Sequence, residues 1–326
     1  MTTIKDVAKH AGVSVATVSR TINNSGYVGV ESRKKIELAI KELNFYPNEV
    51  ARSLFQKKSK FVGLLLPDIS NPFFPLLAKG VEDKMNQMGY QLILGNVQED
   101  MDKEKEYLKA FAQNNVAGVL SAINGGTKEL KNIPLVMLDR VDTDKEYGVH
   151  SNDFEGGQLA AQAIAERNPK EIVVMVGPRS IHGSLERLRG TEKVLNNFKL
   201  NYHLLETNSF QFDATQATTD ELFKQFPKVD SIIASNDVHA LSILQEALRR
   251  GIKVPEELQI IGYDDIPFSQ MLFPSLATIA QPAYEIGFRG AELLCDRIEN
   301  KLVKEKTIQL PVKIKIRESL RKKVLE

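Results

Sequence analysis

The chain has 326 residues, of which 42% are hydrophobic and 26% are charged, so it is long enough for two or three globular domains. No window approaches the roughly 18 uninterrupted apolar residues of a membrane helix, and the N-terminus lacks the apolar stretch of a signal peptide. Cys295 is the single cysteine, which excludes an intrachain disulfide and a cysteine metal cage. We therefore expect a cytoplasmic protein.

The net charge of +1 conceals a basic N-terminal segment. Residues 1–60 contain eleven Lys/Arg and five Asp/Glu, a net charge of +6, and the remaining residues carry a net charge of −5. A basic head on an acidic body is typical of a phosphate-binding module tethered to a domain that does not bind DNA. Basic N-terminal segments also arise by chance, so charge alone does not show that this segment binds DNA, and its sequence motifs are needed as evidence.

The periodicity of residues 4–43 predicts three short helices. Thr3 is placed to cap the first helix, and Gly12 ends it where the backbone needs a positive φ. Ser14 is a suitable N-cap for a second helix over residues 15 to about 23. A third helix then follows, with apolar residues at core spacing.

The spacing of Ala8, Gly12 and Val18 matches the helix-turn-helix, which needs a small residue, a turn glycine and an apolar anchor. Short hydroxyl side chains on the outward face of the second helix can bond phosphates, and Arg20 is long enough for a forked contact with guanine. The alternative is a three-helix unit with a merely solvated Ser/Thr face. The predicted DNA-binding residues of this unit are Thr3, Ser14, Val15, Ala16, Thr17, Ser19, Arg20 and Asn23.

Long, ordered motifs give the chain a resemblance to a known family. They are residues 3–9 (TIKDVAK), 11–20 (AGVSVATVSR), 46–48 (YPN), 51–54 (ARSL) and 317–319 (RES). With these motifs the chain resembles the lactose-repressor (LacI/GalR) family of transcriptional regulators over essentially its whole length.

In that family the segment after the three helices forms a hinge helix on DNA. Pro47 suits a helix start here, but the run from residue 48 to about 55 is short, and isolated helices of this length are marginal in water. The resemblance implies that the segment folds when two copies pack over a minor groove, with Leu54 as an apolar wedge between base pairs. The alternative for Leu54 is an ordinary linker contact. The other hinge residues expected to contact DNA are Asn48, Ala51 and Arg52.

From residue 61 onward, apolar strand-like runs alternate with amphipathic helices, which favours parallel sheets buried on both faces. The runs are 61–66, 91–94, 116–120, 134–138, 171–176, 231–234 and 259–262. The resemblance implies an α/β, two-lobed, periplasmic-binding-protein-like (type I) body with its ligand between the lobes. We expect an all-α helix-turn-helix DNA-binding domain at 1–46, a hinge helix and linker at 47–60, and an effector-binding and dimerisation domain at 61–326.

Polar and aromatic side chains follow many of these runs, where the carboxyl ends of strands form the ligand cleft of open α/β folds. Aromatic rings can cover the C–H faces of a sugar, carboxylates accept hydroxyl protons, and arginines donate. Two acids balance two arginines, which favours a neutral polyol over a phosphate or a purine. The predicted effector-binding residues are Asn71, Phe73, Phe74, Asp139, Arg140, Arg187, Phe210, Asn236, Asp264 and Gln281. Each taken singly also has a structural explanation, such as a helix start or a loop cap.

This set of residues is similar to that of ribose-binding proteins of the same fold. Residues 67–75 (PDISNPFFP) resemble the ribose operon repressors of Gram-positive bacteria, although related stretches occur across the wider family. We therefore predict a homodimeric repressor that binds a pseudo-palindromic operator and is released by D-ribose. The sequence leaves open a phosphorylated pentose as the signal, and corepression instead of induction.

Other functions fit the sequence less well. A catabolite-control regulator of the same family, with a phosphorylated carrier protein as partner, would not need the polar pocket. A transport-associated sugar-binding protein would not need residues 1–60. For an enzyme, the five histidines (10, 150, 182, 203 and 239) lack metal-ligand spacing, and no phosphate-cradling glycine loop occurs. We predict no catalytic residue, no cofactor and no metal.

Overall fold

The computed structural model describes residues 2–23, 25–46, 59–98, 100–123, 130, 132–141 and 146–323. The chain divides into two compact units, Met1–Lys60 and Phe61–Glu326. Asn48, Ala51, Arg52 and Leu54 of the predicted hinge helix lie outside the described residues.

The first unit contains the helices α1 (Ile4–Ala11), α2 (Val15–Asn23) and α3 (Val30–Glu42). Thr3 and Asp6 form the capping box of α1, in which each side chain bonds the other residue's backbone N–H. Gly12 follows with a φ of 66°, which a residue without Cβ adopts at little cost. The three helices enclose a small apolar core of Val7, Ala8, Ala11, Val18, Ile36, Ala39 and Phe45.

The second unit is built on two sheets, each with six strands among the described residues. The first sheet has the order β11-β5-β4-β3-β1-β2 and the second the order β12-β10-β9-β8-β6-β7. Strands of the first sheet are β1 (Phe61–Leu66), β2 (Gln91–Asn96), β3 (Gly118–Ser121), β4 (Leu135–Leu138), β5 (Gly148–Ser151) and β11 (Thr307–Leu310). Strands of the second are β6 (Ile172–Val176), β7 (Tyr202–Glu206), β8 (Ser231–Ile233), β9 (Gln259–Asp264), β10 (Ala277–Ala280) and β12 (Lys313–Lys315). Neighbouring strands pair in parallel, apart from the antiparallel pair β10 and β12.

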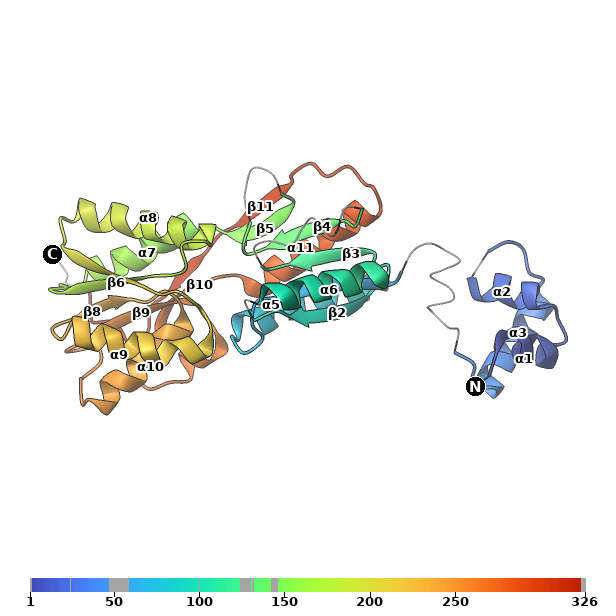
Figure 1. Ribbon diagram of the computed structural model, residues 1–326, viewed down its shortest axis with the longest axis horizontal. Coiled ribbons are helices and arrows are strands. Elements are labelled where there is room, and N and C mark those ends of the chain that lie inside the picture. Colours follow the sequence, from blue (N-terminus) through green and yellow to red (C-terminus); the bar gives the residue numbers. More distant parts are fainter. Residues whose placement is uncertain are drawn as a thin grey trace. The chain divides into compact units, whose positions relative to one another are not determined.

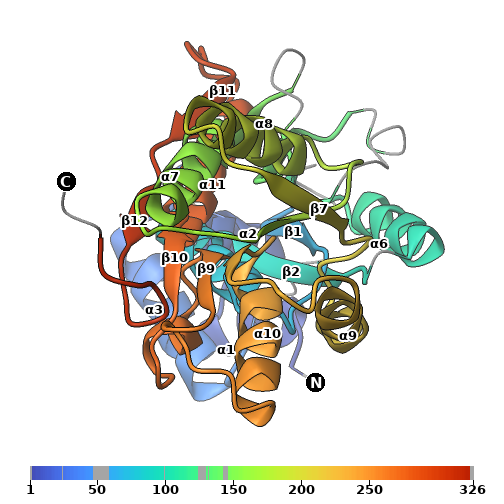
Figure 2. The same cartoon turned by 90° about the vertical axis from the view of Figure 1, so that its left-hand side faces the viewer.

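Helices cover both faces of each sheet and so define two lobes (Figure 1). In the first lobe α5 (Phe73–Gln87) and α11 (Ala283–Ile298) pack on one face, and α6 (Met101–Gln113) packs on the other. In the second lobe α7 (Asp153–Ala165) and α8 (His182–Asn197) lie opposite α9 (Thr215–Gln225) and α10 (Asp237–Arg249), as Figure 2 shows. Short 3-10 turns occur at Phe212–Ala214 and Pro267–Gln270.

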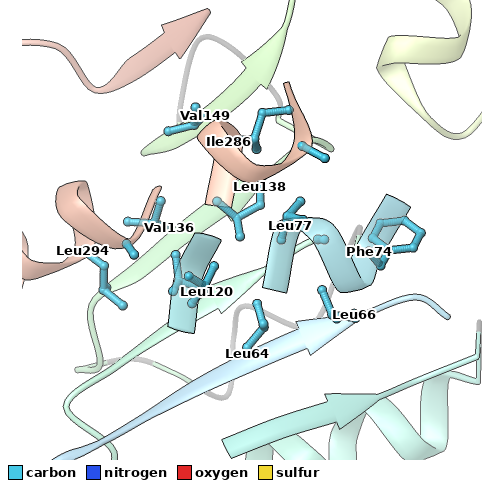
Figure 3. Packing of buried hydrophobic residues seen from close by; sticks show 14 of the residues in the cluster. Leu64, Leu66, Phe74, Leu77, Leu120, Val136, Leu138, Val149, Ile286 and Leu294 are labelled. Carbon is cyan, nitrogen blue, oxygen red and sulfur yellow. The ribbon is translucent and has the colours of Figure 1, made fainter. Parts of the chain in front are cut away.

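The core of the first lobe explains why its central strands β1, β3 and β4 are largely apolar. Leu64 and Leu66 of β1 lie in one buried cluster with Leu120 of β3, beneath Leu77 of α5 and Ile286 of α11 (Figure 3). A strand covered on both faces needs apolar residues on both, so alternation is lost. Burying one such side chain contributes about 1.5–3 kcal/mol.

The chain passes between the lobes where β5 leads into α7, where β10 leads into α11, and where β11 leads into β12. These crossovers place residues of distant sequence position at the boundary of the lobes. None of the helices within the described ranges has both the length and the apolar character of a membrane span.

Candidate functional site

One cavity between the lobes is lined by all ten side chains that the sequence predicts for an effector site. They are Asn71, Phe73, Phe74, Asp139, Arg140, Arg187, Phe210, Asn236, Asp264 and Gln281, joined by Ile181 and Ser184. Most of them follow the carboxyl ends of strands, from β1 in the first lobe to β10 in the second. The free space among them is about 30 Å³, close to the volume of one water molecule, so a sugar can enter only when the walls move apart.

The aromatic wall is fixed by local hydrogen bonding. Asn71 Oδ1 accepts a hydrogen bond of 3.1 Å from the backbone N–H of Phe73, at the start of α5. The rings of Phe73 and Phe74 then meet edge to face, with centroids 5.2 Å apart. The predicted helix start and the predicted pocket role of Asn71 are therefore compatible.

Arg187 is held in place by two buried neighbours. Its Nε donates to Asp153 Oδ1 at 2.7 Å, and its guanidinium carbon lies 3.7 Å from the ring centre of Tyr263. The Tyr263 hydroxyl donates to the same Asp153 oxygen at 3.2 Å. Burial is the largest influence and lowers the pKa of Arg187. Asp153, Tyr263, Asp264 and Asp139 together more than offset this and raise the pKa, so the guanidinium stays charged.

Two acids of the cavity sit on unusual backbone. Asp139 has a φ of 64° and Asp264 a φ of 115°, regions that are costly for residues with a Cβ and that cluster at ligand sites. Burial raises the pKa of Asp139 to about 6, helped by the nearby Asp153, and it raises the pKa of Asp264 well above its usual value. With Asp153 the site contains one more acid than the sequence predicts.

The side-chain amides of Gln281 and Asn236 are both fixed by hydrogen bonds. Gln281 Nε2 donates to Asp264 Oδ1 at 2.7 Å, and Ser151 Oγ donates to Gln281 Oε1. Asn236 caps α10, where its Oδ1 accepts from the backbone N–H of His239 at 2.9 Å. The sequence places Gln281 and Asn236 correctly at strand ends but does not reveal these partners.

Sequence reasoning missed the cavity-lining Ile181 and Ser184, and the supporting residues Ser151, Asp153 and Tyr263. Asp153 lies two residues after β5, but β5 is not among the predicted runs, so its place at a strand end could not be read from the sequence. The described residues contain no cluster of three or more His, Cys, Asp or Glu side chains suited to a metal ion.

The residues predicted to contact DNA in the first unit gather on α2 and its N-terminus. Ser14, Val15, Ala16 and Arg20 are exposed, whereas Thr17, Ser19 and Asn23 are half-buried. Part of the set also bonds locally. Ser14 Oγ accepts from the backbone N–H of Thr17 at 3.1 Å, and Asn23 Nδ2 donates to Ser19 Oγ at 3.3 Å. Thr3 is exposed in its capping box.

Two family models match the chain, one within each of its two compact units. Residues 3–48 match the model of bacterial regulatory proteins of the lacI family, and residues 161–320 match the periplasmic binding protein-like domain. The chain is 48% identical over 325 residues to the ribose operon repressor of Bacillus subtilis (strain 168), which covers 99% of both chains.

Solved structures share the fold. A LacI family regulator from Enterococcus faecium with bound ribose matches with a TM-score of 0.72 and 29% identity, covering 80% of this chain and 98% of that one. A lac repressor dimer bound to operator matches with a TM-score of 0.88 over 98% of this chain and 99% of that one. Its identity is 23%, so this likeness concerns the fold alone.

Proposed function

The chain belongs to the lacI family of bacterial regulatory proteins, and on that premise we propose that it represses a ribose utilisation operon and releases its operator when ribose binds. It is a transcriptional regulator and not an enzyme. One observation carries the choice of ribose. Ten side chains with the chemistry of a polyol site line a single cavity in a chain nearly half identical to a ribose operon repressor.

The sugar is held by complementary walls. Phe73, Phe74 and Phe210 cover the C–H faces of the ring, while Asp139 and Asp264 accept hydroxyl protons. Arg140 and Arg187 donate to ring and hydroxyl oxygens, and the fixed geometry of Arg187 reduces the entropy lost on binding. Asn236 and Gln281 both donate and accept.

The first unit reads the operator. The face of α2 enters the major groove, with Arg20 reaching base edges and the hydroxyls contacting phosphates. Two copies of the chain bind the two halves of a pseudo-palindromic site in the cytoplasm, where bacterial operators lie. Asn48, Ala51, Arg52 and Leu54 extend this contact into the minor groove.

Sugar binding and DNA binding are coupled through the lobes. Closure of the lobes around ribose disturbs the packing of the paired hinge segments, and the wedge at Leu54 withdraws. A thousandfold loss of operator affinity needs about 4 kcal/mol of coupling free energy.

The test is operator binding with and without ribose in two matched arginine variants. Arg187→Ala should retain operator binding and lose release by ribose, because it removes a fixed donor of the cavity. Arg189→Ala, two residues along α8, should behave like the wild type, because Arg189 is exposed, forms an ion pair with Glu186 and does not line the cavity. If the wild type keeps its operator at every ribose concentration, the proposal is wrong.

A further inference from the structure

Two buried serine hydroxyls next to the sugar cavity have no hydrogen-bond partner among the described residues. Ser184, in the first turn of α8, is 4% exposed, and Ser235, just after β8, is 6% exposed. A buried hydroxyl without a partner destabilises a folded protein, so native structures rarely keep one without a use.

The two serines differ in what they face. Ser184 lines the sugar cavity and also a second small cavity behind it, within the second lobe. Ser235 lines the second cavity but not the first. The second cavity has a free volume of about 30 Å³, enough for one water molecule.

The hydroxyl of Ser184 lies beside a wall of the sugar cavity. A Cβ added to Gly177 would come within 2.7 Å of Ser184 Oγ and 2.3 Å of Phe210 Cζ, so the bare glycine lets these two groups lie side by side. The phenyl ring of Phe210 faces the sugar in the proposed function. Ser184 and Phe210 both line the sugar cavity, so a sugar packed against this ring would lie next to the Ser184 side chain.

Ser184 has no structural duty that would explain its hydroxyl. The helix α8 begins after Ile181 without any side-chain cap among the described residues, so the Ser184 hydroxyl does not cap it. The backbone N–H of Ser184 donates to Ile181 O at 3.0 Å. Alanine would serve the helix at least as well.

We propose that Ser184 Oγ bonds one hydroxyl of the bound pentose and thereby helps to set which sugar is accepted. The inference rests on the proposed function. The sugar supplies the missing partner on binding, whereas a sugar without a hydroxyl at that position leaves the Ser184 hydroxyl buried and unpaired. Ser235 bonds no sugar.

Calorimetry with D-ribose on purified full-length variants tests this assignment. Ser184→Ala should weaken ribose binding about tenfold, the usual effect of one lost hydrogen bond in a buried site. Its melting temperature without sugar should stay equal or rise, because an unsatisfied polar group is removed. Ser235→Ala should show the same change in melting temperature and unchanged ribose affinity.

A thermodynamic cycle that combines the Ser184→Ala variant with 2-deoxyribose, 3-deoxyribose and 5-deoxyribose identifies the sugar hydroxyl that Ser184 bonds. Each analogue should bind the wild type more weakly than ribose, and for one of them the deficit should vanish in Ser184→Ala. Ser184→Cys replaces the hydroxyl with a slightly larger thiol that is a weak donor, and it is used in place of the alanine variant if that protein does not fold.

Additive losses for every analogue, or equal loss of affinity in Ser184→Ala and Ser235→Ala, would overturn the assignment and leave the proposed function standing. Failure of the wild type to bind ribose would instead refute the proposed function.

Discussion

The carboxyl group of Asp139 is placed so that its proton should matter for ligand binding. Burial, helped by the nearby Asp153, raises its pKa, while Arg187 and Arg140 act in the opposite direction; the net pKa is about 6. Because the folded pKa lies above the ordinary value of 3.8, this group stabilises the fold below pH 3.8, and that contribution is lost as the pH rises to about 6. Ribose affinity should change with pH in the opposite direction to fold stability and increase as the pH rises. The reason is that an ionised carboxylate accepts stronger hydrogen bonds from hydroxyls.

We predict that ribose affinity rises about tenfold between pH 5 and pH 7, as Asp139 loses its proton. Calorimetry across this range measures the effect. Asp139→Asn should bind ribose more weakly and show a flat profile. An unchanged slope in that variant would assign the proton to another group, such as Asp264, whose pKa is also raised by burial.

Some residues of the site can be predicted from the sequence and others cannot. Side chains directly after an apolar run, such as Asn236 and Asp264, are predictable because strand ends converge in this fold class. Asp153 and Tyr263 are not predictable in this way. Asp153 bonds Arg187, which is 34 residues away in the sequence, and Tyr263 bonds Asp153 across 110 residues. No local sequence pattern predicts contacts over such separations. Ser184 is a third case. It stands out because its buried hydroxyl has no hydrogen-bond partner among the described residues, which only the structure can show.

At the scale of elements, each lobe packs one pair of helices through glycines. A Cβ on Gly157 of α7 would lie 2.0 Å from Arg187 O, and a Cβ on Gly190 of α8 would lie 2.0 Å from Phe154 O. The pair α5 and α11 uses Gly80 and Gly287 in the same way. Close approach of α7 and α8 also sets the backbone position of Arg187, so packing and site geometry are linked.

We predict that Gly190→Ala destabilises the protein by about 1–3 kcal/mol, because the helices must separate to accept the methyl group. This steric cost outweighs the helix propensity gained over glycine. Urea unfolding measures the loss. The control is Asn196→Ala, an exposed position on the same helix, which should change stability by less than about 0.5 kcal/mol. Equal stability of Gly190→Ala and the wild type would contradict the packing argument.

The predicted runs overlap β1 to β4, β6, β8 and β9, but they miss other strands for physical reasons. Strand β7 is an edge strand with exposed residues on most of its length, so its sequence has no apolar run. Strand β11 joins β5 from far along the chain, with Thr307 paired to Gly148. Such pairings depend on the crossovers between lobes and not on local composition.

On the scale of the whole molecule, an exposed apolar groove remains on the second lobe. It runs between α9, α10 and the segment after η3 (Pro267–Gln270), with a cavity of about 650 Å³ lined by Leu241, Leu248 and Phe273. Phe273 is 87% exposed. Apolar surface of this kind marks an interaction site. A second copy of the chain is the occupant that a two-fold operator requires, and an isologous contact would bury both grooves at once.

We therefore predict that Phe273→Glu weakens dimerisation at least tenfold, because a charge would be buried at the centre of the contact without a partner. Sedimentation equilibrium measures the dimer dissociation constant, and operator affinity should fall with it, since a monomer reads only half of the site. Phe198→Glu is the matched control, as Phe198 is an exposed phenylalanine of the same lobe that does not line the groove. If both variants remain dimers at the wild-type concentration range, the groove is not the contact between copies, and the symmetry of operator binding must come from another surface.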